Sequence, residues 1–283
     1  MKHYVAVQLR SRLTKMTAAL QTVRKSPTDI HALHDFRVAT RRFLQAIRLF
    51  SDFLDRKRVR AMRGRLHRLM ESCGAVRNHD VTLELLKDAG ITDPALELEL
   101  LSQRQQLQEE IEARFKRWQG DRSPKHWRKW LRPGLPAGLS WNQDHSAAEN
   151  AHAVLPVMAT ALFDAGKAAT ESGADHDLHR FRLLGKRFRY SLELFPDVYE
   201  PELERHLKQL RGLQDRLGAI NDCAVALEFL KHHPDAEQLV QALLETRRRE
   251  FFTFWKTLAK QSRTWEAWLG GAHRDRDLRL QTR

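Results

Sequence analysis

The chain contains one amphipathic phrase twice, and this repetition constrains its fold more than any other feature. The segment His34–Phe50 returns as His179–Phe195. Both copies open with a histidine, then place Arg or Lys at the third, seventh and eighth positions after it and Phe at the second, ninth and sixteenth. Because an α-helix turns about 100° per residue, this spacing gives one helix an apolar side and a cationic side. Such a helix built twice indicates internal duplication and predicts a binding surface for a large anion.

Two further phrases recur in the same order in each half of the chain. Gly74-Ala-Val is echoed by Gly218-Ala-Ile, and a Trp-x-x-Trp-Leu phrase stands at 127–131 and again at 265–269. Collinear pairs of this kind indicate duplication of a unit of about 140 residues, an ordinary domain size. We therefore expect a first helical-bundle repeat over 1–132, a Pro/Gly-rich linker over 133–146, a second helical-bundle repeat over 147–270 and a basic tail over 271–283.

The spacing of apolar residues is helical along the chain. Within 59–73 and within 203–217 the apolar side chains fall on one stripe, and runs of alternating β-branched residues are absent. The dipeptides Asp93-Pro94 and Pro234-Asp235 are typical of helix starts. The sequence therefore predicts an all-α protein made of two helical bundles.

Features that would direct the chain to a membrane or an oxidising compartment are missing from the sequence. No apolar run is long enough to span a bilayer, and residues 1–10 lack the apolar core of a signal peptide. Cys73 and Cys223 do not suggest a disulfide framework, and Cys73 falls on an apolar stripe. We expect a cytoplasmic protein without membrane insertion.

The charge balance indicates an anionic partner. Lys plus Arg number 49 against 36 Asp plus Glu, a formal net charge of +13 at pH 7. Such a positive field attracts nucleic acids, acidic lipid surfaces or phosphate polymers alike. On a helix the basic side chains of each copy share one arc, where like charges repel by a few tenths of a kcal/mol per pair. Because that arc is built twice and opens with a histidine each time, we interpret it as a binding surface rather than a solvated face.

The candidate binding residues come mainly from the two copies of the phrase. They are the histidines and basic side chains of both copies and one arginine near the second glycine phrase: His34, Arg37, Arg41, Arg42, Arg48, His179, Arg182, Lys186, Arg187, Arg189 and Arg211. A wider set adds Arg63, Arg68 and Lys208. A neutral imidazole can donate a hydrogen bond to a phosphate oxygen, and a bound anion would raise its pKa.

These phrases resemble a known family. The His34-x-x-Arg-Val-x-x-Arg-Arg phrase, the segment Leu178–Tyr190 and the elements Gly74–Asp80 and Leu210–Asp222 resemble motifs of the CHAD domain, the conserved histidine α-helical domain. The resemblance extends from about residue 5 to residue 270, although Cys73 and Asn78 depart from the family pattern. It implies two four-helix bundles related by a pseudo-two-fold axis, with a basic cleft or pore at their junction. It also implies binding of inorganic polyphosphate by a stand-alone member, in some cases at polyphosphate granules, through the candidate residues named above.

Two other functions remain open at the level of sequence. The basic composition also suits an RNA- or DNA-binding helical protein, although such a protein would interleave aromatic residues with its basic ones, and here the Phe residues lie on the apolar side. The His-Asp dipeptides at 34–35, 79–80 and 176–177 raise the possibility of a phosphohydrolase. Arg37 and Arg41 would repel a divalent cation near His34, so we expect no catalysis, no metal and no cofactor. The oligomeric state cannot be read from the sequence.

Overall fold

The computed structural model describes residues 1–119, 123–134, 141–142 and 144–271. Within these ranges the regular structure is helical and contains no strand, which confirms the all-α prediction. Residues 135–140 and 143 of the expected linker and residues 272–283 of the expected basic tail lie outside the described residues.

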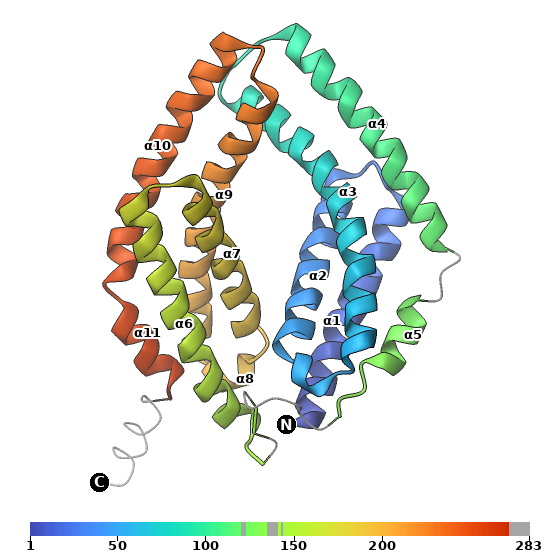
Figure 1. The fold of residues 1–283 in the computed structure, drawn as a ribbon, viewed down its shortest axis with the longest axis vertical. Helices are drawn as coiled ribbons and strands as arrows, with labels where there is room; N and C mark the ends of the chain where they lie inside the picture. Colours follow the sequence, from blue (N-terminus) through green and yellow to red (C-terminus); the bar gives the residue numbers. More distant parts are fainter. Residues whose placement is uncertain (120–122, 135–140, 143, 272–283) are drawn as a thin grey trace. The chain divides into compact units, whose positions relative to one another are not determined.

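The helices of the two halves follow the same order (Figure 1). The first set is α1 (Lys2–Lys25), α2 (Ile30–Leu49), the 3-10 helix η1 (Ser51–Phe53), α3 (Arg56–Asp88), α4 (Pro94–Gln119) and α5 (Ser123–Trp130). The second set is α6 (Ala147–Ser172), α7 (Asp175–Leu192), the short α8 (Pro196–Tyr199), α9 (Leu203–Phe229), α10 (Pro234–Ala259) and α11 (Ser262–Leu269). The repeated phrase forms most of α2 and of α7, as its periodicity predicts. The pseudo-two-fold axis and the repeat boundaries stay predictions.

The chain divides into two compact units. The N-terminal unit consists of Lys2–Ala137 with Asp222–Leu244, and the C-terminal unit consists of Gly138–Asn221 and Glu245–Arg283 with Met1. Two contacts attach the connection between α9 and α10 to the rest of the N-terminal unit. The ring of His79 packs against Phe229 with centroids 4.6 Å apart, and His233 Nδ1 lies 2.8 Å from Asp93 Oδ2.

In the N-terminal unit α2 packs between α1 and α3, α4 lies along α3, and α5 contacts α1 and α3. Asp29 and Asp55 begin α2 and α3 by accepting hydrogen bonds from backbone N–H groups of the first turn. The fully buried side chains of Leu9, Phe36 and Met62 belong to the core between α1, α2 and α3. Burial of one such side chain stabilises the fold by about 1.5–3 kcal/mol.

One aromatic contact is built at equivalent positions in each unit. Phe43 of α2 stacks on Trp127 of α5 with ring centroids 6.5 Å apart. At the matching positions of the second copy, Phe188 of α7 packs against Trp265 of α11 at 5.8 Å. The rings of the repeated phrase thus meet the rings of the repeated Trp-x-x-Trp-Leu phrase within each unit, which extends the duplication from sequence to packing.

In the C-terminal unit α6 runs along α7, and α11 packs on α6. Close approach of α10 to this pair depends on Gly166 of α6. A Cβ at Gly166 would lie 2.2 Å from the ring of Trp255 and 2.8 Å from the ring of Phe181. These two rings also contact each other, with centroids 4.8 Å apart, so neither has room to move away.

We predict that Gly166→Ala lowers the free energy of unfolding by about 1–3 kcal/mol, because the added methyl overpacks two buried rings. Gly218→Ala is the matched control, because Gly218 is also helical and a Cβ there meets no atom within 4 Å. The control should be neutral or stabilising by up to about 1 kcal/mol, the helix propensity difference. Urea unfolding followed by circular dichroism measures both. Equal stability of the two variants would show that Gly166 is not a packing requirement.

Candidate functional site

Helix α2 presents the first copy of the phrase in a fixed orientation. Phe36 and Phe43 are fully buried, and Asp29 Oδ1 accepts a hydrogen bond of 2.8 Å from the backbone N–H of His31 at the start of the helix. With the apolar side held in the core, most of the arc that begins at His34 is turned away from it, and Arg37 is the buried member of the arc. Within the arc, His34 and Arg48 are exposed and Arg41 is partly exposed.

The positive charges around His34 act on its protonation. Loss of hydration is the largest cause that lowers the pKa of His34. The positive charges of Arg77, Arg37 and Arg41 lower this pKa further, and the negative charge of Asp35 raises it. The neutral imidazole is therefore favoured at neutral pH. The structure thus brings together side chains of α2 that the sequence proposed, and it adds Arg77 of α3, which was not among the candidate residues.

Arg37 is a candidate residue that is buried instead of exposed to solvent. The residue is only 8% exposed, and its Nη1 lies 3.3 Å from the position that a Cβ on Gly74 of α3 would take. The first glycine phrase therefore leaves space for a guanidinium group between α2 and α3. Arg37 is positioned to contribute charge to this side of α2 rather than to be a freely moving surface contact.

The other candidates in the N-terminal unit are more dispersed. Arg42 is partly exposed, on the flank of the arc, and Arg63 is partly exposed on α3. Arg68 lines a groove between α3 and α4 together with Arg114 and Arg117. The structure therefore places Arg68 apart from the arc on α2.

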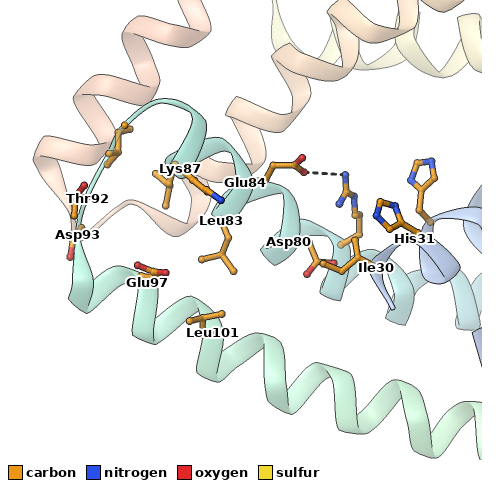
Figure 2. Close-up of a pocket in the computed structure, with 15 residues that line it drawn as sticks. Ile30, His31, Asp80, Leu83, Glu84, Lys87, Thr92, Asp93, Glu97 and Leu101 are labelled. Atoms are coloured by element: carbon orange, nitrogen blue, oxygen red, sulfur yellow. Dashed lines mark ion pairs between the residues drawn. The ribbon is translucent and has the colours of Figure 1, made fainter. Parts of the chain in front are cut away.

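A cavity of about 960 Å³ opens beside His34 (Figure 2). His31, His34 and Arg77 contribute positive or neutral groups to its lining, whereas Glu84 and Glu97 bring carboxylates from α3 and α4. Figure 2 shows Glu84 pairing with an arginine, which is Arg77 at 3.6 Å. The carboxylates disfavour a polyanion in the part of the cavity that they line. A polyanion bound at His34 is therefore expected to follow α2 rather than fill this cavity.

Helix α7 presents the second copy in the C-terminal unit. His179 is exposed, and Arg182 and Lys186 are partly exposed along the same arc. Arg187 lies on the flank and lines a groove of about 660 Å³ between α6 and α7, together with His179 and the carboxylates Asp164 and Asp177. The arc headed by His179 therefore has acidic groups near one edge.

Two candidates of the C-terminal unit are paired with carboxylates. Arg189 lies 3.7 Å from Glu193, both side chains are largely buried, and the guanidinium sits over the ring of Tyr190 at 4.9 Å. Arg211 forms an ion pair with Glu204. Lys208 is exposed on α9. Because their charge is compensated, Arg189 and Arg211 attract an anion less than an uncompensated arginine would.

The described residues show neither a metal cluster nor a membrane-spanning helix. In the part of the chain that the structure describes, no group of three or more His, Cys, Asp or Glu side chains is arranged to hold a metal ion. Among the helices of the described ranges, none combines the length and the apolar composition needed to cross a membrane.

The comparisons agree with the fold and the phrases described above. The family model of the CHAD domain matches residues 7–231, and the chain belongs to this family. The crystal structure of the CHAD domain from the plant Ricinus communis is similar, with a TM-score of 0.65 and 24% identity over 95% of this chain and 91% of that one. PptA from Streptomyces chartreusis is similar, with a TM-score of 0.60 and 18% identity over 93% of this chain and 99% of that one. At these identities the two structures bear on the fold alone. A search of proteins with curated descriptions finds no match.

We predict that His34 makes the fold less stable as the pH falls. The pKa of His34 is lowered in the folded chain from its ordinary value of 6.5, so the unfolded chain takes up the proton first. Stability is therefore lost as the pH falls below about 6.5, and the loss should be smaller in His34→Gln, which cannot take up the proton. Thermal unfolding over a pH series compares the two chains, with His3→Gln as a control. Parallel pH profiles of wild type and His34→Gln would contradict the prediction.

Proposed function

We propose that the chain binds inorganic polyphosphate, without catalysis, along the cationic sides of α2 and α7. Membership of the CHAD family supports this ligand, because the family is associated with polyphosphate. The observation that carries the proposal is the gathering of cationic side chains around His34, with Arg37 and Arg41 on α2 and Arg77 on α3. A cluster of positive side chains of this kind attracts a phosphate chain.

Polyphosphate suits these surfaces for chemical reasons. It carries about one negative charge per phosphate and has no bases, so its receptor needs a row of cationic donors and no stacking partners. The phenylalanines of α2 and α7 meet this condition because they are buried on the opposite side of each helix. Binding of this kind is independent of sequence and falls steeply with salt, because bound counterions are released.

His34 has a defined part in this proposal. In the free protein its imidazole is favoured in the neutral form, which has one N–H to donate. A phosphate chain beside it would raise its pKa and favour the imidazolium, which donates from both nitrogens. Polyphosphate binding should therefore be accompanied by proton uptake. A cytoplasmic protein with this activity would associate with polyphosphate granules.

Charge reversal on each arc tests the proposal. We predict that Arg41→Glu and Lys186→Glu each weaken binding of a defined-length polyphosphate about tenfold or more at moderate salt, because each removes a cation and adds a repelling carboxylate. Isothermal titration calorimetry gives the affinity. These residues are preferred to Arg37, whose burial would confound binding with folding.

Arg56→Glu is the charge-matched control. Arg56 is exposed in the first turn of α3, where a glutamate is tolerated by the helix dipole. The control changes the net charge by the same amount and should weaken binding much less. The proposal fails if all three variants lose the same affinity, because net charge alone would then account for binding. Release of orthophosphate from polyphosphate by the pure protein with Mg²⁺ would overturn the non-catalytic part.

A further inference from the structure

A second basic surface of the N-terminal unit lies on the far side of α3 from α2. Gly74 marks the side of α3 that faces α2, because the guanidinium of Arg37 lies against it. Arg65 and Arg68 are turned from Gly74 by about 180° and about 120° around the helix. They line a groove of about 250 Å³ with Arg114, Arg117 and Trp118 of α4.

The arrangement of the four arginines concentrates charge in this groove. Each helix contributes a pair spaced three residues apart, and residues at this spacing are neighbours on a helix surface. Like charges so spaced repel one another, and the two pairs line the same groove. Among the described residues that line it there is no carboxylate. Guanidinium groups from two helices can contact the oxygens of one bound anion, and Arg is well suited to phosphate oxygens.

Trp118 distinguishes this groove from the arcs on α2 and α7. Its ring is partly exposed and lines the groove beside the arginines. Behind it, Trp127 of α5 is fully buried and meets the Trp118 ring edge to face, with centroids 5.7 Å apart. Trp127 is itself stacked on Phe43. The ring of Trp118 is thus supported from the core before any ligand arrives, which lowers the entropy lost on binding.

An aromatic ring among arginines matches a ligand that carries both phosphates and bases. Single-stranded nucleic acids are bound in this way, with the backbone along a positive groove and bases stacked on aromatic side chains. Helix α5 contributes to a separate basic groove, of about 480 Å³, where its Arg128 and Lys129 lie with Arg10 of α1. We propose that the groove between α3 and α4 binds single-stranded nucleic acid, with a base stacked on Trp118 and phosphates on the four arginines.

This site is independent of the polyphosphate proposal, because polyphosphate has no base to stack. The test uses the full chain and three probes: an oligouridylate of about 12 nucleotides, its abasic analogue, and polyphosphate with a similar number of phosphates. Trp118→Ala should weaken oligouridylate binding roughly tenfold and leave the abasic analogue and polyphosphate unchanged. Trp118→Phe should retain most of the affinity, because it keeps a ring in place. Equal affinity of wild type and Trp118→Ala for oligouridylate would overturn the proposal.

A second pair of variants tests the arginines and does not depend on the packing of Trp118. Arg114→Gln with Arg117→Gln should weaken oligouridylate binding about tenfold more than the charge-matched Arg56→Gln with Arg60→Gln. The proposal is overturned if the two double variants bind alike, or if only Arg41→Glu on α2 removes the binding. An oligothymidylate of the same length tests whether the groove prefers RNA to DNA. Equal binding of both oligomers supports single-stranded nucleic acid in general, and tighter binding of oligouridylate supports RNA.

Discussion

Burial of the phenylalanines of the repeated phrase is the constraint on which the rest of this structure depends. Phe36, Phe43 and Phe50 on one copy, and Phe181, Phe188 and Phe195 on the other, are excluded from solvent. Because side chains three or four positions apart share a helix face, burial of these rings in a core turns most of the basic positions between them outward, although Arg37 and Arg189 stay largely buried. The fold therefore maintains two cationic arcs as a consequence of its hydrophobic packing, and the aromatic contacts with Trp127 and Trp265 lock each arc in the same way.

The two arcs differ in how their charge is compensated. At the first copy, loss of hydration is the main cause that lowers the pKa of His34, and the charges of Arg77, Arg37 and Arg41 lower it further. On α7, Glu193 occupies the position that is Arg48 in the first copy, and it pairs with Arg189. A solvated surface would relieve like-charge repulsion in both copies by this kind of pairing. The pairing of Arg189 with Glu193 lowers the attraction of the α7 arc for an anion at that position.

Periodicity predicted the helical class and the orientation of the phrase on α2 and α7, and the proline dipeptides predicted the helix starts at Pro94 and Pro234, because these features are local in the sequence. These local patterns could not predict contacts between helices. Arg77 reaches His34 from another helix, and its only sequence signal was its place in the Gly74–Asp80 element. The burial of Arg37 against Gly74 and the pairing of Arg211 with Glu204 likewise depend on tertiary packing. Of the groove at Trp118 the sequence indicated only Arg68, because the arginines of this groove come from two helices far apart in the sequence.

The central claim is that the arc on α2 contacts phosphate directly. The most direct test is the slope of log affinity for polyphosphate against log salt concentration, measured for wild type, Arg41→Gln and Arg56→Gln. A residue that neutralises a bound phosphate contributes about one to that slope through counterion release. We predict that Arg41→Gln reduces the slope by about one and that Arg56→Gln leaves it unchanged. An unchanged slope in Arg41→Gln, or an equal reduction in both variants, would contradict the claim.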